Sequence, residues 1–276
     1  MEKRKLGASG IEVKPFCFGG NVFGWTADER TSFELLDAYT DNGFDFIDTA
    51  DVYSKWAPGN KGGESETIIG NWIKRTGKRD KLIIATKVGK PMAPEKKGLS
   101  KKYIMQAVEA SLKRLQTDYI DLYQSHDDDK ETPLAETMEA FTELISQGKI
   151  RAAGASNYSG ARLSEALQVS QQNGLMQYQS IQPEYNLYAR QGYETDIEPV
   201  CIANNIGVIT YYSLAAGFLT GKYRSENDFG KSSRGESMKR YLDQRGLLIL
   251  TALDEVSKEY NVVPATIALA WLIARP

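Results

Sequence analysis

Short apolar runs alternate along this chain with longer segments in which apolar residues recur at helical spacing. Such runs are typical of buried β-strands, and the longer segments of amphipathic helices. The predicted strands are residues 16–19, 44–48, 82–87, 119–124, 150–156, 180–182 and 207–211. They recur roughly every 30 residues, which is the length of one strand–helix unit.

Polar residues at the ends of the longer segments predict where the helices begin. Thr26 and Glu29 have the spacing of a capping box. Ser100 and Ser159 are expected to cap the starts of two later helices, because a serine oxygen can accept a hydrogen bond from a free backbone N–H. Pro133 is expected at the first position of another helix, where its missing N–H costs nothing.

Seven consecutive strand–helix units favour a parallel sheet with outer helices, either closed into a barrel or open and doubly wound. A doubly wound dinucleotide domain should carry G-x-G-x-x-G after its first strand, but residues 19–24 read G-G-N-V-F-G. We therefore predict an α/β fold, a (β/α)8 TIM barrel, as a single domain over residues 1–276. Residues 5–14 are expected to form an N-terminal β-hairpin that caps the barrel.

The C-terminal part departs from this repeat. Residues 254–260 and 264–274 both have the pattern of helices, and no eighth strand follows residues 207–211. Because an open barrel would expose two strand edges, the expectation is that the last strand and helix are missing and the domain is incomplete. Residues 224–240 are charged and rich in serine and glycine, which predicts a mobile loop able to fold over a cofactor.

Composition excludes several classes of protein. The 34 basic and 36 acidic residues are well mixed, so neither a nucleic-acid nor a membrane-surface partner is expected. With one histidine, His126, and two cysteines, zinc sites with several histidines and disulfide scaffolds are excluded. Three aspartates follow His126, but consecutive residues cannot all face one ion, so no metal site is predicted. The charged N-terminus and the lack of a long apolar run predict a cytoplasmic protein.

Four reactive side chains follow the ends of predicted strands, which meet at one mouth of a barrel. They are Asp48, Tyr53, Lys87 and His126. A phenol is a poor acid near neutral pH unless a cation stabilises its phenolate, and Lys87 could supply that cation while Asp48 holds it. His126 could orient a substrate oxygen. The set is suited to protonating a carbonyl oxygen, with a bound nicotinamide as the missing source of hydride.

These residues stand in motifs that together resemble the aldo-keto reductase family. The motifs are D-T-A-D-V-Y at 48–53, A-T-K at 85–87, Y-Q-S-H at 123–126, G-A-S-N at 154–157, Q-P-E-Y-N at 182–186 and Y-Y-S-L-A-A-G-F-L-T-G-K-Y at 211–223. Each motif is short, but they occur in order through nearly the whole chain. Residues 53–66 resemble the bacterial and plant-type branch, which also includes the β subunits of potassium channels.

The resemblance implies that Tyr53 is the general acid, supported by Asp48, Lys87 and His126. It also implies a nicotinamide cofactor, NADPH by the family's preference, with NADH possible. The implied cofactor-binding residues are Ser156, Asn157 and Gln182 at the carboxamide, Tyr211 on the ring face, and Leu214, Gly217, Leu219 and Lys222 along the pyrophosphate. The loop motif here reads Tyr-Tyr-Ser-Leu, without the family's usual proline.

Alternatives remain for some of these residues. Trp25 and Trp56 are expected either to form an aromatic wall of the pocket for a small carbonyl substrate or to pack within their loops. A cofactor-binding regulatory subunit of another protein would keep the same four side chains as a reductase. An aldolase with Lys87 as Schiff base would explain the lysine but not Asn157, Gln182 and Tyr211 together.

Overall fold

The structure, a computed structural model, describes residues 2–275 and divides into two compact units. The first unit contains the described residues up to Ile181 together with Val200–Ile209. The second contains Gln182–Pro199 together with the described residues from Thr210 onward. The prediction of a single domain over residues 1–276 stays a prediction.

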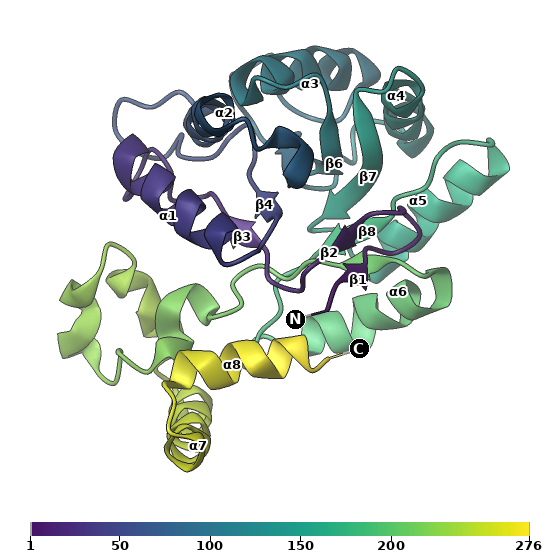
Figure 1. Ribbon diagram of the computed structural model, residues 1–276. Coiled ribbons are helices and arrows are strands. Elements are labelled where there is room, and N and C mark those ends of the chain that lie inside the picture. Colours follow the sequence, from purple (N-terminus) through teal and green to yellow (C-terminus); the bar gives the residue numbers. More distant parts are fainter. Residues whose placement is uncertain (1, 276) are drawn as a thin grey trace. The chain divides into compact units, whose positions relative to one another are not determined.

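The first unit is built on a curled, parallel sheet in which the strands are neighbours in chain order (Figure 1). The seven strands are β3 (Phe18–Gly19), β4 (Phe46–Asp48), β5 (Ile83–Val88), β6 (Ile120–Ser125), β7 (Ile150–Ser156), β8 (Ser180–Gln182) and β9 (Gly207–Val208). The α/β class, the parallel sheet and the sequential order of strands are therefore confirmed. Closure into an eight-stranded barrel stays a prediction.

The N-terminal hairpin is also present. Strands β1 (Arg4–Lys5) and β2 (Glu12–Val13) pair antiparallel, and Leu6 and Ile11 between them pack with inward-facing residues of the sheet. The members of this core are Leu6, Ile11, Val13, Phe46, Ala85, Leu122, Ala152 and Ile209. The hairpin comes so close to the sheet that a Cβ on Gly7, whose φ is +57°, would lie 2.3 Å from the carbonyl oxygen of Gln179. Glycine is required there because no side chain fits.

Helices connect successive strands on the outer side of the sheet (Figure 1). They are α1 (Glu29–Asp41), α2 (Glu64–Thr76), α3 (Lys101–Leu115), α4 (Leu134–Ser146) and α5 (Gly160–Gln172), with a 3-10 turn, η1 (Arg79–Lys81), before β5. Ser100 and Ser159 cap α3 and α5 as predicted, each accepting from a backbone N–H three residues on.

Two predicted helix starts are wrong. The capping box at Thr26 does not form, because residues 22–27 make a turn in which Val22 accepts from the Thr26 N–H. Asp28 caps α1 instead and accepts from the Thr31 N–H. Pro133 is the N-cap of α4, one position before the first helical residue, and its ψ of 134° is extended.

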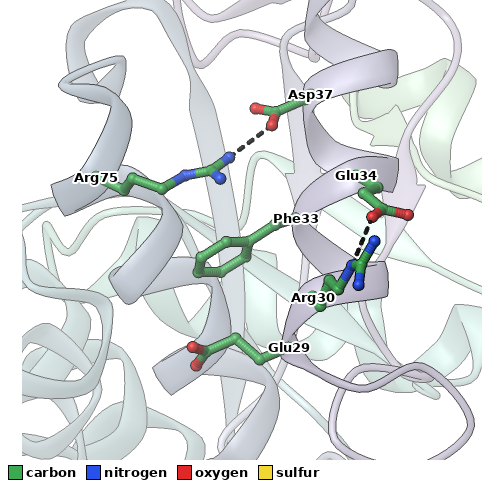
Figure 2. A pocket seen from close by; sticks show the side chains of 6 residues that line it. All are labelled: Glu29, Arg30, Phe33, Glu34, Asp37 and Arg75. Carbon is green, nitrogen blue, oxygen red and sulfur yellow. Dashed lines mark hydrogen bonds and ion pairs between the residues drawn. The ribbon is translucent and has the colours of Figure 1, made fainter.

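Helices α1 and α2 are joined by ionic and aromatic contacts at a small surface pocket (Figure 2). The Arg75 guanidinium from α2 lies over the Phe33 ring from α1, 4.5 Å from its centroid. It also pairs with Asp37 at 2.5 Å, and the Trp72 indole donates to the same carboxylate. None of the sequence-predicted site residues lines this pocket.

The second unit is mainly helical. Its elements include the π-helix η2 (Tyr193–Ile197), the 3-10 segments η3 (Ala215–Thr220), η4 (Glu226–Lys231) and η5 (Gly235–Tyr241), and the helices α7 (Gln244–Tyr260) and α8 (Pro264–Ile273). Helix α6 (Glu198–Asn204) begins in this unit and continues into the first. The core of the second unit comprises Ala215, Phe218, Leu219, Tyr223, Met238, Tyr241, Leu250, Leu253 and Ala268.

The structure bears on two expectations for this region, and it corrects one of them. The helix predicted at 254–260 begins ten residues earlier, because Asp243 caps α7 by accepting from the Gly246 N–H. Residues 224–240 form η4 and most of η5, with Met238 fully buried in the core, and the mobility of this segment over a cofactor stays a prediction. In the described residues, no helix has both the length and the apolar character needed to cross a membrane.

Candidate active site

The structure brings the four predicted reactive side chains together where β4, β5 and β6 end. The Lys87 ammonium donates to Asp48 Oδ2 at 2.6 Å and to the Tyr53 hydroxyl at 2.9 Å. The His126 ring meets the Tyr53 ring edge to face, with centroids 5.8 Å apart. Acid, ammonium, phenol and imidazole thus form one connected cluster.

The strands and a short turn hold these groups in place. Asp48 is the last residue of β4, Lys87 lies in β5, and His126 follows β6, where its N–H donates to the carbonyl of Val88 at 2.8 Å. Tyr53 lies on the turn after β4 and donates its N–H to the carbonyl of Ala50 at 3.2 Å. Three neighbouring parallel strands therefore deliver the groups to one edge of the sheet.

Sequence reasoning missed the role of Gln124. Its side-chain amide donates to Asp48 Oδ1 at 3.2 Å, while Lys87 binds the other oxygen, so the carboxylate is held at both ends. Gln124 pairs in register with Lys87. The sequence signal that could have identified Gln124 was the alternation of side chains along β6. Gln124 lies two residues beyond the inward-facing Leu122, so it faces the same side.

Burial and the neighbouring charges together set the protonation states of Lys87 and Tyr53. Burial alone would lower the pKa of Lys87, but Asp48 and Tyr53 raise it above its ordinary value, so the ammonium keeps its charge. Burial raises the pKa of Tyr53 to about 12, against the lowering effect of Lys87. The cation acts in the expected direction, but desolvation outweighs it, and the phenol holds its proton over the usual pH range.

His126 is neutral in this environment. Burial, followed by the charges of Lys87 and Lys90, lowers its pKa to about 2. Its Nδ1 is buried and has no hydrogen-bond partner among residues 2–275. A neutral imidazole has one N–H to donate, so it can orient an oxygen atom without supplying the transferred proton.

Of the two predicted pocket tryptophans, Trp56 lies beside the phenol and Trp25 packs against Trp56. Trp56 meets the Tyr53 ring with centroids 6.1 Å apart, and it meets Trp25 edge to face at 5.7 Å. Half of Trp56 is exposed to solvent. The two indoles therefore form an aromatic surface next to the reactive group.

The predicted cofactor residues of the first unit lie next to His126. Ser156 is the last residue of β7 and is buried. Asn157 follows with a φ of +58°, and its amide donates to the His126 carbonyl and to Asp127 Oδ1, each at 2.9 Å. A hydroxyl and an amide are chemically suited to hydrogen-bond a carboxamide.

Gln182 and Tyr211 lie in the second unit by the same division. Gln182 is buried at the end of β8. The Tyr211 N–H donates to the Pro183 carbonyl at 3.0 Å, and its ring meets that of Tyr212 at 5.3 Å. Tyr212 has a φ of +53°, and its carbonyl accepts from the Asn186 amide at 3.0 Å.

The residues predicted to bind the pyrophosphate differ in burial and in the groups that could contact a ligand. Leu219 is fully buried in the core of its unit, so only its backbone could meet a ligand. Leu214 is half-buried, and Gly217 has a φ of +109°. Lys222 is exposed, with its ammonium 5.1 Å from the Tyr223 ring centroid.

Comparison with known proteins supports a family assignment. Residues 15–276 match the sequence profile described as "Aldo/keto reductase family". The chain belongs to the aldo/keto reductase family. The cluster of Asp48, Tyr53, Lys87 and His126 therefore lies in a reductase-family scaffold.

Relatives within this family carry different names. The chain is 35% identical to an uncharacterized oxidoreductase of Bacillus subtilis, over 100% of this chain and 84% of that protein. It is 34% identical to a probable voltage-gated potassium channel subunit beta of Arabidopsis thaliana, with the same coverage. An aldo-keto reductase of Schizosaccharomyces pombe whose name includes NADP(+) is 32% identical over 99% of this chain and 79% of its own length.

Proposed function

We propose that this aldo/keto reductase transfers hydride between NADPH, or NADH, and a small aldehyde or ketone. The observation that carries the proposal is the chain of contacts from Tyr53 through Lys87 to Asp48 at the ends of the strands. A protonated phenol next to a buried ammonium is suited to deliver a proton to a carbonyl oxygen. Active sites of (β/α)8 barrels lie at this end of the strands, which agrees with the position of the cluster.

Each side chain has a distinct part in this reaction. The Tyr53 hydroxyl donates its proton to the carbonyl oxygen as negative charge develops there, and Lys87 stabilises the resulting phenolate. Asp48 keeps the lysine charged and fixed in position. Neutral His126 donates a hydrogen bond that orients the carbonyl oxygen. A nicotinamide, when bound, would supply the hydride.

The cofactor would be held by the hydroxyl and amide side chains. Ser156, Asn157 and Gln182 would bind the carboxamide, and Tyr211 would stack on the ring. Leu214, Gly217, Leu219 and Lys222 would follow the pyrophosphate, with Lys222 as the cation. The name of the Schizosaccharomyces pombe relative supports NADP(+) as the oxidised form.

The substrate would be a small carbonyl compound that packs against Trp25 and Trp56. The contact of Trp56 with Tyr53, and of Trp25 with Trp56, supports this role, because an apolar wall orients a substrate and excludes water from the reacting oxygen. Neither a nucleic acid nor a membrane surface is required as a partner.

The variant Tyr53→Phe tests the general acid. It removes the transferable proton and keeps the ring, so kcat for aldehyde reduction should fall at least about 100-fold. The dissociation constant for NADPH, measured by fluorescence titration, should stay within about twofold, since the phenol acts on the transition state. Tyr260→Phe, at an exposed position, is the matched control. Retained reduction in Tyr53→Phe, or parallel loss of NADPH binding, would contradict the assignment.

A regulatory subunit is the second candidate. It is favoured by the 34% identity to the Arabidopsis protein named as a potassium channel subunit beta. An enzyme should complete many turnovers per site with an aldehyde panel, whereas a regulator should oxidise one bound NADPH and then stall. Stopped-flow absorbance of NADPH followed by steady-state measurement separates the two.

A further inference from the structure

A buried carboxyl group lies two residues before Tyr53 and has no role in the proposed reaction. Asp51 is only 2% exposed, and neither of its side-chain oxygens has a hydrogen-bond partner in the described part of the chain. Its backbone N–H donates to the carbonyl of Lys87 at 3.2 Å. Asp51 therefore connects the turn that carries Tyr53 to the strand that carries Lys87.

The neighbours of Asp51 offer little to stabilise a negative charge. Glu66 from α2 is fully buried and repels it, and Arg114 from α3 already pairs with Glu66 at 2.7 Å. Tyr103 from α3 and Tyr123 from β6 also interact with the Asp51 charge.

Tyr123 and Lys87 also give little stabilisation to a negative charge on Asp51. The Tyr123 hydroxyl is itself buried without a partner among residues 2–275, and Lys87 from β5 is engaged by Asp48 and Tyr53. An ionised carboxylate here would be desolvated, and the Val52 backbone N–H and the engaged cations Arg114 and Lys87 would offset only part of that cost. Burial and Glu66 accordingly raise the pKa of Asp51 to about 8, against the opposing effects of Arg114, the Val52 backbone N–H and Lys87.

We propose that Asp51 is a positioning residue for Tyr53, acting in its protonated form and loosening the turn over residues 49–54 when it ionises. Because the uncharged acid fits the buried space, the turn stays closed on β5 and aims the phenol at the carbonyl. Ionisation draws water or a counter-charge into that space and releases the turn. The inference rests on the proposed carbonyl reduction.

The other titratable groups of the site do not mask the effect of Asp51 ionisation on activity. Tyr53 has a pKa of about 12 and His126 a pKa of about 2, so neither changes charge near neutral pH. A loss of activity on going from about pH 7 to about pH 9 would therefore report Asp51. If only the protonated form is active, kcat falls about tenfold over that range.

The first test is a pH profile of kcat with 4-nitrobenzaldehyde and NADPH. Wild type should show the fall in kcat, with KM for NADPH unchanged. Asp51→Asn, whose amide cannot ionise, should remain active without this fall. Asp80→Asn makes the same change at an exposed position and should behave as wild type. The same pH profile in wild type and Asp51→Asn would overturn the role of Asp51.

The second test needs no turnover. Amide hydrogen exchange of a peptide covering residues 49–56 should show less protection in wild type as pH rises through about 8, after correction for intrinsic exchange. Exchange that is independent of pH in wild type would overturn the inference, even if Asp51→Asn failed to fold. If protection is lost as pH rises but the chain reduces no carbonyl compound at any pH, the proposed function is overturned and the pH response of the turn is not.

The dependence of thermal stability on pH is an independent test of whether folded Asp51 holds its proton. The folded chain holds the Asp51 proton to a higher pH than the unfolded chain does, so its stabilising effect is complete below about pH 4 and is lost as pH rises to about 8. The melting temperature of Asp51→Asn relative to wild type should rise over that window. A constant difference between the two would contradict a buried, protonated Asp51.

Discussion

Lys87 shows how one buried charge can be tolerated in this protein. It is fully buried, and its ammonium is satisfied by Asp48, Tyr53 and the carbonyl of Thr49. Removing one member of a buried ion pair leaves the other charge without compensation, whereas removing both does not. Stability and catalysis can therefore be separated at this residue.

Lys87→Met should lower the free energy of unfolding by about 3–5 kcal/mol, because Asp48 loses its cation. The double variant Lys87→Met/Asp48→Asn should recover much of that stability. Both should lose aldehyde reduction at least about 100-fold, since the phenolate is no longer stabilised. Urea unfolding and steady-state kinetics measure the two effects. If the double variant were as unstable as Lys87→Met alone, an uncompensated charge on Asp48 would not be the cause of the instability.

At the level of elements, capping side chains decide where the helices begin. Ser159 accepts from the Arg162 N–H at 3.2 Å and so satisfies one free donor of α5. Ser164, in the interior of the same helix, has the same hydroxyl but cannot act as a cap. The two serines form a matched pair within one helix.

Ser159→Ala should lower the free energy of unfolding by about 1 kcal/mol through loss of the cap. Ser164→Ala should raise it by a few tenths of a kcal/mol, roughly, because alanine is the better helix former. Chemical unfolding of both variants measures the difference. Equal effects of the two substitutions would rule out the capping role.

For the whole molecule, each compact unit has its own hydrophobic core, one around Leu122 and one around Phe218. A ligand that binds the folded chain and not the unfolded chain raises the free energy of unfolding by mass action. Cofactor binding can therefore be detected without any substrate.

NADPH at about 100 times its dissociation constant should stabilise the chain by about 2.7 kcal/mol and raise its melting temperature by several degrees. Tyr53→Phe should keep this shift, and Asn157→Ala should reduce it. Differential scanning fluorimetry with NADPH and with NADH compares the two cofactors. No shift with either would contradict the proposed nicotinamide site.

The sequence by itself determined the order of the strands and identified the four reactive side chains that meet in the candidate site. Apolar periodicity is a local property, so residues 150–156 and 180–182 were predicted with the bounds that the structure shows. Predictions that depended on neighbours distant in sequence were less successful. The short helical segments within residues 224–240 depend on the core around Met238, whereas the start of α7 is marked by a local signal, the cap at Asp243, that the prediction overlooked.

Only the tertiary structure decided the charge state of the candidate site. The motif that contains Asp51 and Tyr53 does not reveal their burial, yet burial raises the pKa of both. The hold of Gln124 on Asp48 likewise depends on two strands that are far apart in the chain. Desolvation and Coulomb interaction act through space, so they follow from which residues pack together and not from the order in which they occur.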